Sequence, residues 1–137
     1  MTGYFDGASR GNPGDAGAGA WLDGGDGNAV WETASYLGRK TNNEAEYNAA
    51  ILLIKAARER GVTRLTVRGD SKLVVSQLAK LWKINLPHLR ELAQEAWRAA
   101  EGMTVVYEWI PRERNKRADK LSNEAIDNAA GGALRRG

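Results

Sequence analysis

The chain has 137 residues, of which 42% are hydrophobic and 27% are charged, as is ordinary for a soluble globular domain. These values exclude a disordered tail, a collagen-like fibre and a repeat array, and they predict one domain over residues 1–137. The chain contains no cysteine and a single histidine, which excludes disulfides, thiolate metal sites and multi-histidine zinc sites. A bound metal would therefore have oxygen ligands, the type that Mg²⁺ and Mn²⁺ prefer.

The net charge of +3 is unevenly spread along the chain. Residues 1–38 hold five acids and one base, a net of −4, whereas residues 39–137 hold 19 bases and 12 acids, a net of +7. A polyanionic partner explains this pattern, and so does a merely basic soluble protein.

The longest apolar run covers residues 49–54 and is far shorter than the roughly 20 residues of a membrane span. Residues 1–6 lack the pattern of a secretory signal. We therefore expect a cytoplasmic protein with no membrane partner. We also expect a monomer, because the sequence has no long apolar stripe beyond those that the predicted core uses.

The first third of the chain is rich in glycine and turn residues and predicts an antiparallel meander of three strands. The expected strands are Tyr4–Ser9, Ala16–Leu22 and Ala29–Leu37. Two runs of turn residues, 11–15 and 23–28, separate them.

The remainder of the chain alternates between helical and strand periodicity. Helices are expected at Asn43–Arg60, Ser71–Lys80, Pro87–Glu101 and Asn115–Ala130, and strands at Arg64–Arg68 and Met103–Ile110, with a flexible tail at about 131–137. Helices that connect successive strands imply parallel pairing by right-handed crossovers. The predicted fold class is α/β, with a mixed five-stranded sheet of three antiparallel strands followed by parallel strands, flanked by helices.

Four carboxylates occupy unusual places in this pattern. Asp6 lies inside the first predicted strand, where aspartate is unfavourable; it is either an edge residue or part of a site. Glu46 continues the apolar stripe of its helix, because Ala50, Leu53 and Ile54 follow it at helical spacing. A carboxylate at the edge of the core is costly unless a cation or hydrogen-bond donors meet it.

The other two carboxylates lie where a strand or a helix begins or ends. Asp70 follows the predicted strand Arg64–Arg68, at the end of a parallel sheet where ligands bind, although it could instead cap the next helix. Asp119 lies in the first turns of the last helix, where the helix dipole alone could explain an acid.

The predicted topology brings these four carboxylates to the same end of the sheet. Four converging carboxylates repel one another strongly at low dielectric, and bound cations relieve that repulsion. Two divalent ions bridged by carboxylates are the usual site for in-line phosphodiester displacement. The expected cofactor is Mg²⁺, as two ions, with Mn²⁺ as a substitute.

Four sequence blocks resemble type 1 ribonuclease H. They are DGASRGNPG at 6–14, TNNEAEY at 41–47, GDSKLV at 69–74 and NKRADKL at 115–121, and they come in the order found in that family. The resemblance implies the ribonuclease H-like fold and endonucleolytic cleavage of the RNA strand of RNA–DNA hybrids. It implies products with 5′-phosphate and 3′-hydroxyl ends, and it assigns catalysis and metal binding to Asp6, Glu46, Asp70 and Asp119.

The resemblance also suggests substrate-binding residues. Asn12 and Asn43, with Gln77 as a further candidate, are expected in the minor groove, where 2′-hydroxyls distinguish RNA from DNA. The side chains expected to bind a phosphate of the DNA strand are Arg39, Thr41 and Asn85. Thr41 precedes a helix N-terminus, which suits a phosphate, although it could equally be a simple helix cap.

Two features depart from many family members. The loop before Asp119 has no histidine, and the chain resembles the subgroup in which an arginine, here Arg112, takes that place. Arginine does not deprotonate, so Arg112 would steady phosphate charge or assist product release, unless the loop is merely a solvated basic segment. The long basic protrusion of some members is replaced by a short connector, in which Trp82 and Lys83, with neighbouring Lys80, could contact hybrid.

Two other functions remain open on the sequence. One is a nuclease of the same fold that also cleaves double-stranded RNA. The other is a non-catalytic nucleic-acid-binding module, against which the presence of all four acids speaks.

Overall fold

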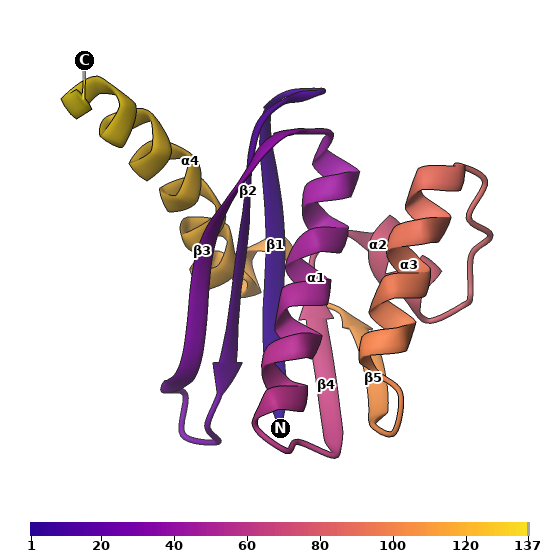
Figure 1. Cartoon of the computed structure of the whole chain (residues 1–137). Coiled ribbons are helices and arrows are strands. Elements are labelled where there is room, and N and C mark those ends of the chain that lie inside the picture. The colour runs from indigo at the N-terminus through magenta and orange to yellow at the C-terminus, as the bar shows by residue number, and fades with distance from the viewer. Residues whose placement is uncertain (137) are drawn as a thin grey trace.

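The computed structural model describes residues 1–136, and the side-chain surroundings of residues 1–129. Five strands form one mixed sheet in the order β3-β2-β1-β4-β5 (Figure 1). Strand β1 is central and pairs antiparallel with β2 and parallel with β4, while β3 extends the antiparallel side and β5 the parallel side. The predicted sheet is therefore confirmed. The strands are β1 (Thr2–Gly11), β2 (Gly14–Asp23), β3 (Ala29–Lys40), β4 (Arg64–Gly69) and β5 (Thr104–Trp109).

The first three strands are longer than predicted. The ladder between β1 and β2 continues to the pair Gly11–Gly14, because backbone hydrogen bonds pair residues whose side chains carry no strand signal. Strand β3 continues past Leu37 to Lys40 through Gly38, which has a φ of 76°.

The helices are α1 (Asn42–Glu59), α2 (Lys72–Leu78), α3 (Pro87–Ala99) and α4 (Lys116–Arg136), with a 3₁₀ turn, η1 (Arg112–Arg114), that the sequence did not predict. Helix α2 is shorter than expected: Ser71 is its N-cap and Lys80 beyond its end has a φ of 63°. Helix α4 does not end at Ala130 but continues to Arg136. The flexibility expected of residues 131–137 stays a prediction, and Gly137 lies outside the described residues.

Opposite faces of the sheet are covered by α1 and α4 (Figure 1), and glycines allow both helices to approach closely. A Cβ on Gly7 of β1 would lie 2.3 Å from the backbone of α1, and a Cβ on Gly19 of β2 would lie 2.2 Å from the carbonyl oxygen of Ala118 in α4. Real Cβ atoms do not come so close, so these positions exclude larger residues. The core between the sheet and α1 includes the fully buried Phe5 and Tyr47. Among the described residues, no helix is long and apolar enough to cross a membrane.

Candidate active site

The β1–β4 pairing ends just before two of the predicted acids. The last paired residues are Phe5 and Gly69, so Asp6 is the next residue of β1 and Asp70 directly follows the end of the neighbouring strand β4. Asp6 is 5% exposed in the central strand, which excludes the edge-residue interpretation. Asp70 does not cap the following helix, because the Ser71 hydroxyl accepts the Val74 amide hydrogen at 3.2 Å and fills that role. The Asp70 carboxylate is therefore available to the site.

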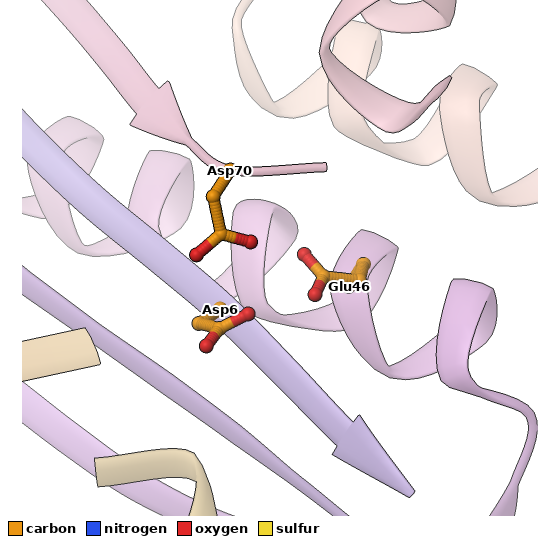
Figure 2. A group of neighbouring side chains, drawn as sticks. All are labelled: Asp6, Glu46 and Asp70. Carbon is orange, nitrogen blue, oxygen red and sulfur yellow. The ribbon is translucent and has the colours of Figure 1, made fainter. Parts of the chain in front are cut away.

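The Glu46 side chain approaches Asp6 and Asp70 from helix α1, which packs against β1. It lies in the second turn of α1 and is 3% exposed, as its place on the apolar stripe predicted. The helix start is fixed by a capping box in which the Thr41 hydroxyl accepts from the Glu44 amide and the Glu44 carboxylate accepts from the Thr41 amide. Figure 2 shows the carboxylates of Asp6, Glu46 and Asp70 directed toward one another. One oxygen of each lies within 4.8 Å of the others.

Crowding and burial change the acidity of this cluster. Burial raises the pKa of Asp6 from 3.8 to about 7, with the Glu46 carboxyl opposing the shift and the charges of Asp70 and Asp119 adding to it. Burial and the charge of Asp6 raise the pKa of Glu46 well above its usual value. Burial also raises the pKa of Asp70, against a hydrogen bond from Asn115 and the positive charge of Arg112. The carboxylates therefore destabilise one another when all are ionised.

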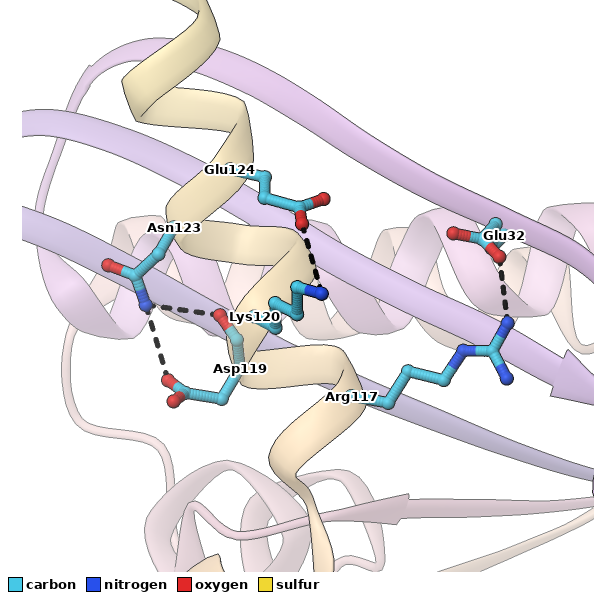
Figure 3. A network of polar contacts seen from close by, with 6 residues as sticks. All are labelled: Glu32, Arg117, Asp119, Lys120, Asn123 and Glu124. Atoms are coloured by element: carbon cyan, nitrogen blue, oxygen red, sulfur yellow. Dashed lines mark hydrogen bonds and ion pairs between the residues drawn. The ribbon is translucent and has the colours of Figure 1, made fainter.

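Asp119 borders this cluster without belonging to the three-residue group. It lines the same pocket, of about 290 Å³, together with Asp6, Glu46 and Asp70. Its carboxylate accepts from the Asn123 side-chain amide at 3.3 Å. Figure 3 shows Asp119 turned toward Asn123, whereas Arg117 on the same helix reaches Glu32 of β3. Of the four acids predicted to converge, Asp6, Glu46 and Asp70 lie close together, and Asp119 lies on the wall of the same pocket.

Arg112 is placed at the pocket by η1. Its side chain is exposed and lines the pocket, and its charge lowers the pKa of Asp70. Arg114, at the other end of the same turn, is exposed and is not a lining residue. The geometry thus places Arg112, and not Arg114, at the acidic pocket.

All the predicted nucleic-acid contacts except Gln77 fall on exposed or partly exposed positions. Asn12 is exposed, and its side-chain oxygen accepts the backbone hydrogen of Asn42, which itself lines the pocket. Asn43 is partly exposed in the first turn of α1. Arg39 lies near the end of β3 and Asn85 in the connector before α3, and both are exposed. Thr41 is confirmed as the cap of α1.

Gln77 was predicted to contact the substrate, but the structure places its side chain inside the protein. It is 4% exposed, and its side-chain oxygen accepts from the Tyr47 hydroxyl at 2.7 Å while its amide donates to the Lys83 carbonyl. Both ends of the side chain are satisfied inside the protein. Helix α2 directs Gln77 toward the core. The sequence did not predict this, because the short helix has no clear polar face.

Asn123 and Asn42 line the pocket and were not predicted. An asparagine on a helix carries no signal of which neighbours it meets. For Asn123, the spacing of four residues after Asp119 was the available clue, because residues i and i+4 lie on one helix face.

The cluster suits a divalent cation. All its potential ligands are carboxylate oxygens, which hard cations prefer. The Glu46 Oε2 atom is buried and has no hydrogen-bond partner, although buried polar atoms are nearly always paired. A cation held by Asp6, Glu46 and Asp70 would satisfy this oxygen and offset the repulsion among the three acids.

Comparisons with known proteins agree with this geometry. The reverse transcriptase-like family model matches residues 4–125. Ribonuclease HI of Halobacterium salinarum is 48% identical over 130 residues, covering 92% of this chain and 64% of the relative. Ribonuclease H of Francisella philomiragia is 31% identical over 144 residues, covering 93% and 91%. Bifunctional protein Rv2228c of Mycobacterium tuberculosis is 45% identical over 127 residues. This chain spans only 35% of that relative and less than two thirds of the Halobacterium protein.

Solved structures share the fold over nearly the whole chain. The crystal structure of ribonuclease H1 from Halobacterium salinarum superposes with a TM-score of 0.89 at 45% identity, covering 93% of this chain and 97% of that one. The structure of LC11-RNase H1 in complex with an RNA/DNA hybrid gives a TM-score of 0.89 at 38% identity, covering 94% and 98%. With its acidic cluster beside the central strand, the chain belongs to the type 1 ribonuclease H family.

Proposed function

We propose that this protein is an endoribonuclease that hydrolyses the RNA strand of RNA–DNA hybrids and leaves 5′-phosphate and 3′-hydroxyl ends. The observation that carries the proposal is the cluster of buried Asp6 and Glu46 with half-buried Asp70, with one oxygen of each within 4.8 Å of the others. The structural relative in complex with an RNA/DNA hybrid supports the choice of substrate. A non-catalytic module would have no reason to maintain so costly a cluster.

The proposed cofactor is Mg²⁺, as two ions, with Mn²⁺ as a substitute. Asp6, Glu46 and Asp70 would be the main ligands, and Asp119 on the pocket wall would complete the set. Divalent ions held there would supply Lewis-acid stabilisation to the attacking water and the leaving 3′-oxygen.

Polar residues in and near the pocket would orient the substrate strand. Arg112 would place a permanent positive charge beside the scissile phosphate, because arginine stays protonated. Asn12 lies in the turn between β1 and β2, and Asn43 lies in the first turn of α1; their side-chain amides would bind 2′-hydroxyls of the RNA strand. The Asn12–Asn42 hydrogen bond holds that segment against the pocket.

The DNA strand would be held away from the acids. We assign a phosphate contact to Arg39, Thr41 and Asn85, since the N-terminus of α1 favours an anion. Exposed Trp82 and Lys83 in the short connector would add stacking and phosphate contacts. Phosphate contacts of this kind make binding weaken as the salt concentration rises.

The decisive experiment compares three labelled duplexes of one sequence: RNA–DNA hybrid, double-stranded RNA and double-stranded DNA. Incubation with Mg²⁺ should cut the RNA strand of the hybrid, and excess chelator should stop the reaction. Cleavage of double-stranded RNA as well would widen the substrate range to duplexes that contain RNA. Cleavage that persists in chelator, or an intact hybrid at every Mg²⁺ and Mn²⁺ concentration, would contradict the proposal.

A further inference from the structure

Asn115 joins three parts of the chain that carry the acidic residues. It is 1% exposed and lies between η1 and α4. Its side-chain Nδ2 donates to the carbonyl oxygen of Phe5 at 2.9 Å and to Oδ2 of Asp70 at 3.1 Å. Its backbone carbonyl accepts the amide hydrogen of Asp119 at 3.1 Å. One residue thus contacts the neighbour of Asp6, the Asp70 carboxylate and the backbone of Asp119.

The chemistry of these contacts selects an asparagine. Both side-chain partners are acceptors, and only an amide NH₂ offers two hydrogens from one small planar group. An aspartate of the same shape would offer none, and it would place another negative charge against Asp70. The amide therefore ties the backbone of β1 to the carboxylate of Asp70 through a single nitrogen.

The side-chain oxygen of Asn115, unlike its nitrogen, makes no hydrogen bond that explains its burial. Its Oδ1 is buried and has no hydrogen-bond partner, a state that costs free energy. A residue selected only to begin a helix would need no buried amide, because serine or threonine caps as well without this cost. The unpaired oxygen indicates that the two donated hydrogen bonds are what the position requires.

Asp70 needs such a support because it lies beyond the ladder. The β1–β4 pairing stops at Gly69, and the Ser71 hydroxyl serves the next helix rather than Asp70. The indole nitrogen of Trp109 donates to the backbone carbonyl of Asp70 at 3.1 Å, which fixes the main chain. Among the hydrogen bonds of the described residues, the one from Asn115 is what fixes the carboxylate.

We propose that Asn115 is a positioning residue that holds the Asp70 carboxylate against strand β1, so that Asp70 stays beside Asp6 as a ligand of the proposed divalent cation. The inference rests on the proposed metal-dependent hydrolase. It assigns Asn115 no contact with substrate: the residue acts by orienting a ligand, as outer-shell hydrogen bonds do at other metal sites.

The first test measures Mn²⁺ binding by calorimetry, without substrate. Asn115→Ala should bind Mn²⁺ about 10- to 100-fold more weakly, the usual loss when an outer-shell partner is removed. Asn115→Ser guards against misfolding, because serine begins helices well but offers one hydrogen on a shorter side chain; it should also lose affinity. Tyr47→Phe is the matched control. It removes a buried hydrogen bond to Gln77 and should lower the melting temperature without changing Mn²⁺ affinity.

The second test is a double-mutant cycle in metal-free protein, with urea unfolding as the readout. If Asn115 acts through Asp70, the effects of Asn115→Ala and Asp70→Ala on unfolding should not add, because the second substitution removes a contact already lost. On hybrid, Asn115→Ser should lower kcat and leave KM unchanged.

Two results would overturn the inference: additive effects in the cycle, or Asn115 variants that are folded and bind Mn²⁺ like the wild type. Failure of the wild type to cleave hybrid would instead remove the proposed function. The Mn²⁺ binding and unfolding measurements would still test the role of Asn115, because neither depends on cleavage.

Discussion

Gly7 of β1 and Glu46 of α1 approach so closely that a Cβ on residue 7 would lie 2.3 Å from the backbone nitrogen of Glu46. The glycine immediately follows Asp6, so the helix contacts the sheet where the acids meet. Glycine serves here by occupying no space, which allows a carboxylate from α1 to reach the end of β4.

Gly7→Ala should therefore damage both stability and the metal site. The methyl group must push α1 away from β1, and overpacking of this kind costs about 1–3 kcal/mol of unfolding free energy. Moving α1 also carries Glu46 away from Asp6, so Mn²⁺ affinity should fall. Urea unfolding and calorimetry measure the two effects.

Gly27→Ala provides the control for Gly7→Ala. Gly27 has a φ of 84° with no atom within 4 Å of a Cβ, so alanine there strains the backbone without crowding a neighbour. It should reduce stability by about 1–2 kcal/mol, the cost of a Cβ in the left-handed region, and leave Mn²⁺ binding intact. Equal Mn²⁺ affinity for both variants would contradict the role assigned to Gly7.

Asp70→Asn should abolish cleavage while the fold is retained. The substitution keeps the shape of a half-buried side chain but removes a charged ligand, so the rate on hybrid should fall by more than about 100-fold, beyond the usual loss for an outer-shell partner. Circular dichroism and gel-shift binding to hybrid should match the wild type. Hydrolysis at a wild-type rate would remove Asp70 from the metal site.

The metal-free protein should become less stable as pH rises toward 7. Burial raises the pKa of Asp6 from 3.8 to about 7, so between these values the folded state binds more protons than the unfolded chain. The unfolding free energy then falls with increasing pH, by at most about 1.4 kcal/mol per pH unit for one group. Melting temperatures measured in chelator from pH 4 to 8 check this sign.

Asp6→Asn is the companion variant for the pH experiment. In chelator it should be more stable than the wild type at pH 8, and the difference should shrink toward pH 4, because Asp6 of the folded wild type is then protonated and uncharged. Mg²⁺ should stabilise the wild type more at pH 8 than at pH 5. A metal-free wild type whose stability rises between pH 4 and 7 more steeply than that of the variant would contradict this account.

Arg112→Ala should slow cleavage by about 10- to 100-fold, less than the loss of a buried oxyanion donor, because the side chain is exposed. Its charge lowers the pKa of Asp70, so removing it should move the acidic limb of the pH–rate profile to higher pH. Arg112→Lys should recover part of the rate.

Arg114→Ala is the matched substitution in the same turn and should leave the rate unchanged, because Arg114 is not a lining residue of the acidic pocket. A larger loss for Arg114→Ala than for Arg112→Ala would reverse the assignment.

Much of the sheet could be predicted because its signals are local. Turn residues separate three strands, the change to helical periodicity marks the crossovers, and Gly61 ends α1, where its φ is 73°. The strand ends and the length of α2 could not be predicted, since ladder bonds and caps depend on neighbours far along the chain.

Residue type and position were enough to predict which acids could form the site: Asp6 inside a strand, Glu46 on the apolar stripe of a helix, and Asp70 at the end of a parallel strand. How these acids meet depends on packing between distant segments, which the folded structure shows. It showed that Ser71, not Asp70, caps α2, that Gln77 is buried and that Arg112 rather than Arg114 lines the pocket. It also placed the Asn115 side chain against the carbonyl oxygen of Phe5, which lies 110 residues away. Residue type and spacing limit local conformation, whereas contacts between distant segments arise only when packing places one backbone against another.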